Sequence, residues 1–317
     1  MGRKKAPAPA PVNAPFTALQ DWAAGQPHDL AFLTRDAAWS PTFSEQSFPA
    51  GIAEVHQLWS TGADLSWLGG PALRPSATSP AAAHSEAASS EAAWPRSSAG
   101  TALSHVITIA LADAHRAGDA ETKAGWPQHA EGLPTTGALE VFHDLSTFGT
   151  DPADGDSAAW LVRWLPEPDR SAFATEPDDL DTPGSVCQAG LFQPGWSTPS
   201  PEDLLHAPEE QFAAAEALTG EYRRAWMLQR ALPSSEYLLP TTHLYGHSQH
   251  GTDLALTTLR EALPLQSDDS HRLVLEVESW THLNGWFGDA GTLQVWMRRS
   301  DLHARRFDAA WCMIRTD

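Results

Sequence analysis

Period-two alternation of apolar side chains is the feature of this sequence that most restricts its fold. Three segments show it, at residues 105–111, 272–278 and 292–298. Such alternation places successive side chains on opposite faces of an extended strand, so each segment predicts a β-strand. In residues 105–111 both rows are largely apolar, which is typical of a central strand covered on both faces. The chain is therefore expected to fold around a β-sheet.

Further strands and a helical block complete the expected architecture. Apolar runs predict strands at residues 160–165 and 309–315. Between the two groups of strands, helical spacing predicts helices over residues 208–231 and 252–263, the second with Thr252 as its N-cap. Strands, then helices, then strands indicate an α+β fold of mainly antiparallel, twisted sheets with packed helices, rather than a regular βαβ repeat.

Composition divides the chain into a tail, a globular part and an insertion. Residues 1–14 are rich in Pro and Ala and predict a disordered tail, because they cannot bury enough apolar surface to offset chain entropy. Residues 15–317 are expected to be globular, as one unit or as two lobes, residues 15–199 and 200–317. The Ala-, Ser- and Pro-rich residues 76–93 predict a flexible insertion.

The charge balance restricts the classes of partner. The chain has 40 acidic and 20 basic residues, and the resulting net charge of -20 repels phosphate backbones and anionic lipid headgroups. Neither nucleic acid nor a membrane is therefore expected as a partner. No uncharged apolar run is long enough to span a bilayer. The acidity either serves solubility or forms a face that binds a basic protein.

The cysteines and the N-terminal residues indicate a cytoplasmic location. Residues 1–5 are basic, but Ala and Pro follow where a secretory signal needs an apolar core. Cys187 and Cys312 are the two cysteines, too few for a disulfide framework. As a single pair or as two buried thiols, they fit a reducing compartment.

The C-terminal third resembles the YwqG-like family, a widespread bacterial family, in the order and spacing of its residues. The matching residues are Gly288-Asp289-Ala290-Gly291-Thr292-Leu293-Gln294-Val295-Trp296, Asp301-Leu302, Phe307-Asp308, Trp311, the loop residues His243, Gly246 and Gln249, and, upstream, Trp94-Pro95 and Leu133-Pro134. The resemblance covers residues 65–317 and implies an α+β fold, but it implies no particular activity. Where members often carry Asp-Ser-Asp, this chain has Glu276-Val277-Glu278.

A pocket is predicted where the loop, a strand end and the Gly-rich turn would meet. Its candidate residues are His243, Gly246, Gln249, Glu278, Trp286 and Asp289. Asp289, between glycines, either anchors a tight turn through an Asx-type bond or acts as a base or ligand beside His243 and Glu278. The second interpretation requires these side chains to converge in space.

Three histidines in the same loop offer another interpretation. His243, His247 and His250, with Asp253 three residues further on, are of the side-chain types that bind zinc and other divalent metals. Three imidazoles with an open fourth position would activate water, which predicts a metal-dependent hydrolase. The alternative is a hydrogen-bonded or exposed loop, which the neighbouring Gly, Ser and Thr residues favour.

The sequence favours a non-enzymatic function. It contains no nucleophile elbow and no phosphate-binding Gly-rich motif, and no cofactor is expected apart from that divalent metal. We therefore expect a binding or regulatory module, for example one that neutralises a toxin, which presents an acidic, Trp-bearing surface. Trp280 and Trp286 are expected at this surface, where indoles could instead bind a glycan.

Overall fold

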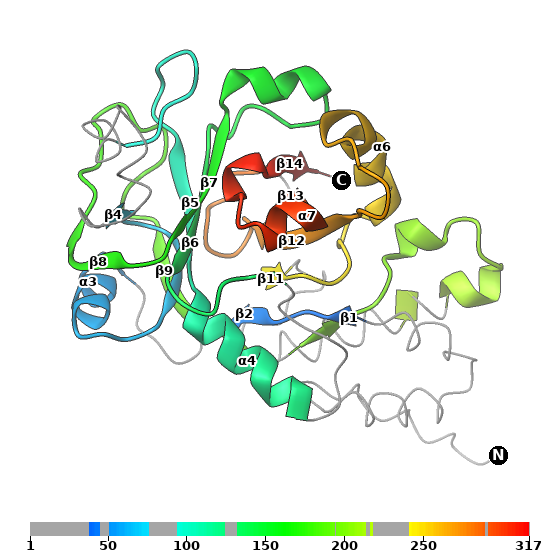
Figure 1. Ribbon diagram of the computed structural model, residues 1–317, viewed down its shortest axis with the longest axis horizontal. Coiled ribbons are helices and arrows are strands. Elements are labelled where there is room, and N and C mark those ends of the chain that lie inside the picture. Colours follow the sequence, from blue (N-terminus) through cyan, green and yellow to red (C-terminus); the bar gives the residue numbers. More distant parts are fainter. Residues whose placement is uncertain are drawn as a thin grey trace, which may run out of the picture.

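One antiparallel sheet organises the part of the chain that the computed structural model describes (Figure 1). The described residues are 38–44, 51–75, 94–123, 132–193, 195–213, 216–217, 241–288 and 291–316. Within them, ten strands are paired in the order β14-β13-β12-β11-β2-β9-β3-β5-β6-β7. In chain order these strands are β2 (Thr42–Ser44), β3 (Ser66–Gly69), β5 (Ser104–Ala110), β6 (Ala138–His143), β7 (Trp160–Leu165), β9 (Cys187–Gln193), β11 (His243–Leu244), β12 (His271–Glu278), β13 (Thr292–Arg298) and β14 (Trp311–Arg315).

Smaller elements surround this sheet. In the described residues, two strand pairs join β1 (Ala38–Trp39) to β10 (Trp196–Ser197) and β4 (Leu73–Pro75) to β8 (Pro168–Phe173). The helices whose bounds the structure describes are α3 (Ile52–Ser60), α4 (Leu111–Lys123), α6 (Thr252–Ala262) and α7 (Arg299–His303), and the 3-10 turns among the described residues are η2 (Pro152–Ser157), η3 (Pro201–Leu204) and η4 (Phe307–Ala309). No helix in the described ranges is long and apolar enough to cross a membrane.

The sheet curls until its two edge strands come close together. Trp160 Nε1, in edge strand β7, donates a hydrogen bond of 3.1 Å to the carbonyl oxygen of Ala310, just before β14. The rings of Trp160 and Trp311 meet edge to face, with centroids 4.9 Å apart. The curl gives the sheet an inner and an outer face, so that alternate residues of each strand lie in different surroundings.

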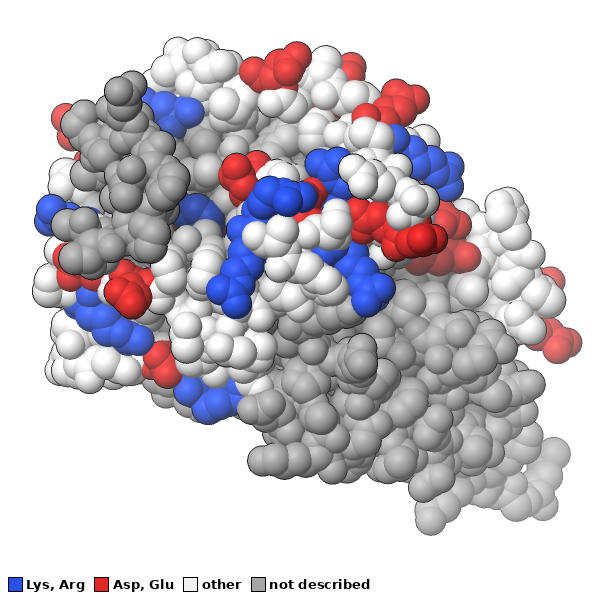
Figure 2. All heavy atoms as spheres, in the orientation of Figure 1, with Lys and Arg blue, Asp and Glu red and all other residues white. Residues whose placement is uncertain are grey.

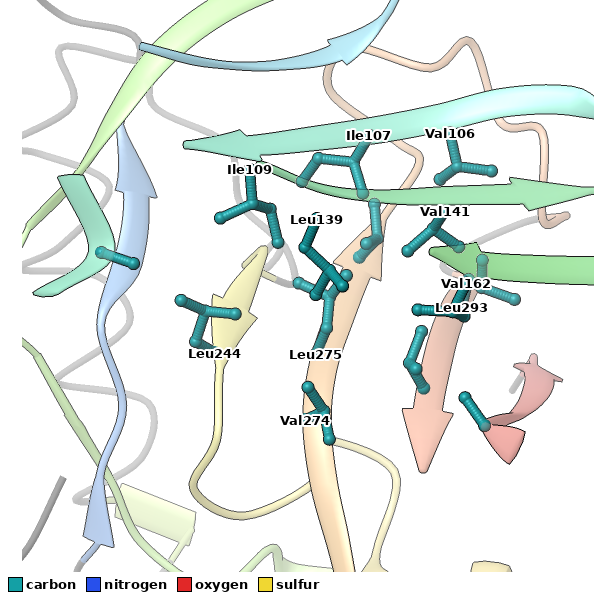
Figure 3. Close-up of a cluster of buried hydrophobic side chains, with 14 of the residues drawn as sticks. Val106, Ile107, Ile109, Leu139, Val141, Val162, Leu244, Val274, Leu275 and Leu293 are labelled. Carbon is teal, nitrogen blue, oxygen red and sulfur yellow. The ribbon is translucent and has the colours of Figure 1, made fainter. Parts of the chain in front are cut away.

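Aliphatic side chains fill the inner side of the curl. Figure 3 shows those of β5, β6 and β7 close to those of β11, β12 and β13, and its labelled residues belong to one buried cluster: Val106, Ile107, Ile109, Leu139, Val141, Val162, Leu244, Val274, Leu275 and Leu293. Burial of this surface is the main favourable contribution to folding. The polar residues that alternate with it on these strands therefore lie on the outer face.

The predicted α+β class is broadly confirmed, and strands form at the predicted segments. The alternating segments are β5, β12 and β13, and β5 is buried along its whole length between β3 and β6. The predicted strand at 160–165 is β7, whereas the one at 309–315 begins two residues later, because Phe307–Ala309 form η4. Helix α4 was not predicted: the alternation ran on to Leu111, where this helix begins.

Helix α6 begins where it was predicted, but its N-cap comes from another segment. Gly251 occupies the N-cap position, and Thr252 is the first helical residue. Asp203 Oδ1 accepts hydrogen bonds from the backbone amides of Thr252 (2.7 Å) and Asp253 (3.2 Å). The prediction that Thr252 caps the helix was therefore wrong, because a carboxylate 49 residues earlier satisfies these amides and also suits the positive end of the helix dipole.

Both proposed lobes contribute strands to the same sheet. Strand β2, from the first lobe, lies between β11 and β9. Cys187 and Cys312 are unpaired and buried, on β9 and β14. The predicted tail at 1–14, the insertion at 76–93 and most of the predicted helix at 208–231 lie outside the described residues.

Candidate functional site

A buried carboxylate, Glu276 on β12, lies at the centre of the candidate site. The strand register pairs it with His243 of β11 on one side and with Gln294 of β13 on the other. Residues that are directly opposite in a sheet share a face, so the three side chains form one row on the outer face. Glu276 is fully buried in this row, although it carries an ionisable group.

Three groups of the chain surround the Glu276 carboxylate. The backbone amide of Gln249 donates to Oε2 at 3.1 Å, and the hydroxyl of Thr292 donates to Oε1 at 3.1 Å. The third group is the His243 ring, whose Nε2 lies 3.5 Å from Oε2. A buried carboxylate is stable only when such donors and a positive charge replace the water that it has lost.

The surroundings of His243 indicate where its protons lie. Its Nδ1 is 2.8 Å from the carbonyl oxygen of Tyr245 and 3.0 Å from Ser40 Oγ. A carbonyl oxygen can only accept, so Nδ1 carries a proton and donates it. The other nitrogen, Nε2, faces the Glu276 carboxylate, which also only accepts. In its doubly protonated form the ring has a proton on the side of each contact, and in that form His243 and Glu276 are a buried ion pair.

This environment keeps Glu276 ionised. Burial by itself would raise the pKa of Glu276. The hydrogen bond and charge of His243, the charge of His250 and the amide of Gln249 outweigh burial, and they hold the pKa of this carboxyl below its ordinary value. At neutral pH, Glu276 is therefore a carboxylate.

The same residues fasten the loop at 241–251 to the sheet. The side chain of Gln249 accepts from the backbone amide of Thr241 (2.9 Å) and donates to its carbonyl oxygen (2.7 Å). Gln294 donates to Ser248 Oγ at 2.6 Å. Gly246 has a φ of 80°, and a Cβ atom there would lie 2.3 Å from Ser197 Oγ. A side chain at this position would therefore force the segments apart.

The structure brings together some residues of the predicted pocket and separates others. His243 and Gln249 both contact Glu276, and the backbone amide of Glu278 donates to Oγ1 of Thr242, the residue just before β11, at 3.1 Å. Trp286, by contrast, packs against the aliphatic core cluster. Asp289 lies outside the described residues.

The metal interpretation gains no support from the arrangement of the four residues behind it. His243 is occupied by Glu276 and Tyr245, the backbone amide of His247 donates to Ser197 Oγ, and Asp253 is exposed on α6. Within the described residues, which include all four, no three His, Cys, Asp or Glu side chains gather closely enough to hold a metal ion.

A second buried carboxylate, Glu140 on β6, was also missed from the sequence. It accepts hydrogen bonds from Arg163 Nε (2.8 Å), from the backbone amide of Leu73 (2.7 Å) and from Thr108 Oγ1 (3.3 Å). These bonds join β4, β5 and β7 to β6. Both glutamates could have been detected as acidic residues inside strands whose neighbours are apolar, because such residues need buried partners.

Comparison with known protein families shows which family the chain belongs to. Residues 87–315, which are more than half of the chain, match a family described as Domain of unknown function (DUF1963). The chain belongs to the DUF1963 family. YwqG-like proteins are members of this family, so the resemblance found in the sequence is confirmed. No curated protein matches the sequence.

The residues that carry the DUF1963 resemblance hold the fold together. Trp94 Nε1 donates to the carbonyl oxygen of Leu103 (2.6 Å), and Trp311 Nε1 donates to that of Gly149 (2.8 Å). Asp301 is buried and accepts from the guanidinium groups of Arg298 and Arg306, while Leu133, Leu302 and Phe307 belong to the aliphatic core cluster. Packing and hydrogen bonding therefore account for the residue types at these positions, and no catalytic role is needed to explain them.

Proposed function

We propose that this protein is a non-enzymatic binding module that docks a basic protein partner. The observation that supports this most is the burial of the charged groups in the candidate site. The side chains of His243 and Glu276 are 4% and 0% exposed, and their polar atoms face other groups of the chain. A catalytic group must reach its substrate, whereas these groups hold a loop in place.

Trp280 is the proposed anchor for the partner. It is 50% exposed and lies at the start of the loop that joins β12 to β13. The loop is held by its own hydrogen bonds: Ser279 Oγ accepts from the amide of Phe287 (3.2 Å), and the Ser279 carbonyl accepts from the amide of Gly285 (2.9 Å). An indole held in this way loses little entropy on binding, which is typical of interface anchors.

The net charge supports a basic partner. A charge of -20 attracts cationic proteins over long range and accelerates their encounter at low salt. Figure 2 shows acidic and basic side chains intermixed over the described part of one face, so the charge does not collect there in a single acidic patch. We also propose that the protein is cytoplasmic. Neutralisation of a basic toxin is one form that the proposed function could take.

Titration with poly-L-lysine tests the proposal. We expect binding to weaken by at least about tenfold between about 50 mM and about 300 mM salt, because screening shortens the reach of the charges. Trp280→Ala should weaken it further, through the lost contact between the lysine ammonium and the indole. Phe148→Ala is the matched control, because this aromatic side chain is 49% exposed at another place on the surface.

Two results would contradict this function. The first is binding that does not depend on salt or that responds equally to both substitutions. The second is a change in Trp280 fluorescence with neutral oligosaccharides and none with poly-L-lysine, which would favour a glycan-binding module.

A further inference from the structure

The two most exposed large apolar side chains of the described residues lie at one end of helix α6. Leu205 is 69% exposed and Leu254 is 55% exposed. Leu205 follows directly after η3, and Leu254 is in the first turn of α6. A single exposed leucine is ordinary on a protein surface, whereas apolar side chains that gather in one place mark an interaction site.

Contacts between η3 and α6 hold the two leucines near each other. Asp203, two residues before Leu205, accepts hydrogen bonds from two backbone amides in the first turn of α6, which contains Leu254. The Cβ atom of Glu202 is 3.0 Å from the place that a Cβ atom at Gly251 would take, so η3 lies directly against the start of the helix. Figure 1 shows the η3 segment beside α6. Both leucine side chains therefore reach the solvent at the same end of α6.

The inner side of α6 fixes the helix on the sheet. The residues buried on that side, in one cluster with side chains of β13 and β14, are Ala255, Leu259 and Leu263. The outer side takes no part in this packing, and Leu254, Thr257 and Glu261 are exposed there. Thr257 is short, so a second helix can approach α6 closely and place its side chains between the rows of α6. A surface that is already held in place loses little entropy when a partner binds.

The segments that carry the two leucines are strongly acidic. Residues 201–210 and 252–262 contain six acidic residues and one basic residue, Arg260, whereas the whole chain has 40 against 20. Asp203 caps α6 and offsets the positive end of its dipole. The other five are exposed, and none of them forms an ion pair with another described residue: Glu202, Glu209, Glu210, Asp253 and Glu261. This surface therefore attracts a cationic partner more strongly than the average charge of the chain indicates.

We propose that the acidic, apolar surface around Leu205 and Leu254 binds a basic amphipathic helix of a partner protein. Such a helix carries apolar residues along one stripe and lysine or arginine beside it. The stripe covers the two leucines, and the cations lie near the free carboxylates. This inference rests on the proposed function for the charge of the partner. It places the contact on α6 rather than at Trp280, and it specifies the secondary structure of the segment that binds.

Two synthetic peptides of the same composition test this surface on the full chain. Both contain about 14 residues, all of them leucine or lysine. In the first peptide the leucines recur at the spacing of one helix face, and in the second their order is permuted so that no stripe forms. We expect calorimetry to give a Kd for the first peptide that is at least about tenfold lower. Circular dichroism should show that it gains helicity on binding, because an isolated helix of this length is marginal in water.

Substitutions of exposed leucines assign the binding to this end of α6. Leu205→Ser and Leu254→Ser should each weaken binding of the first peptide by at least about fivefold, because each removes apolar surface that the stripe covers. Leu265→Ser is the matched control, since Leu265 is 42% exposed and lies beyond the other end of the helix. All three side chains are exposed, so thermal melting should show that the variants fold.

A second pair of variants tests the charge. Asp253→Asn combined with Glu261→Gln should weaken binding and reduce its dependence on salt, because two of the free carboxylates are lost. Glu167→Gln combined with Asp178→Asn removes the same charge from exposed positions outside these segments, and it should do neither.

Three results would overturn the inference. They are equal binding of the two peptides, a loss in the Leu265→Ser control as large as at Leu205 and Leu254, or a dimer of the free protein that Leu254→Ser dissociates. Sedimentation detects the dimer, which would assign the surface to a second copy of the chain. If poly-L-lysine binds through Trp280 while the two peptides bind equally, the proposed function stands without the α6 contact. If neither poly-L-lysine nor the peptides bind, both proposals fall.

Discussion

Replacement of His243 by leucine should destabilise the fold strongly, because it removes the histidine that pairs with a buried carboxylate. Glu276 would keep only the amide of Gln249 and the hydroxyl of Thr292 as donors, at 3.1 Å each. Removal of one partner of a buried ion pair costs about 3–5 kcal/mol. The total stability of a domain is about 5–15 kcal/mol. We therefore expect the melting temperature to fall by roughly 10 °C.

Urea denaturation followed by Trp fluorescence measures this effect in a double-mutant cycle. The pair His243→Leu and Glu276→Leu together should cost less than the sum of the two single changes, because no charge is then left buried. Arg96→Met, which breaks an exposed ion pair with Asp179, is the control and should have little effect. The reasoning is refuted if His243→Leu is as mild as this control, or if the two changes are additive.

Three further predictions follow from other buried groups. Burial raises the pKa of Asp113 from 3.8 to about 6, so the stability that this shift contributes is present below pH 3.8 and lost as the pH rises through 6. Asp113→Asn should flatten this decline of the melting temperature with pH. A pH profile unchanged by the substitution would contradict the prediction. Asp203→Ala should cost about 1 kcal/mol and accelerate hydrogen exchange at the Thr252 amide, whereas unchanged exchange would show that the cap is not needed. Burial raises the pKa of Cys187 to about 12 and that of Cys312 in the same direction, so both thiols should react with iodoacetamide only after unfolding, and rapid labelling of the native protein would disprove this.

The strands could be predicted because their signal is local. The alternation in β5, β12 and β13 depends only on which face of each strand is apolar. That pattern is complete within the seven or eight residues of each strand. The cap of α6 could not be predicted in this way. Asp203 reaches the amide of Thr252 across 49 residues, and nothing near the helix indicates it.

The candidate site was predicted only in part, because some of its contacts join segments that are distant in the sequence. His243 and Gln249 were identified through a family resemblance, but Glu276 emerges as their common partner only when the register of β11 and β12 is known. The metal interpretation rested on the side-chain types in the loop, and the sequence left open whether their rings converge. In the structure, His243 lies in a strand, whereas His247 follows the bend at residues 245–246 and has no regular secondary structure.

The titration of Glu276, followed through its side-chain carboxyl carbon by NMR, tests the central claim most directly. Two opposing effects act on this group, the loss of water and the ion pair with His243, and the sign of the pKa shift shows which one dominates. The account predicts a pKa below the ordinary value of 4.5, with stability lost as the pH falls through it. A pKa above 4.5 would show that burial prevails and that His243 does not hold a carboxylate at the centre of this site.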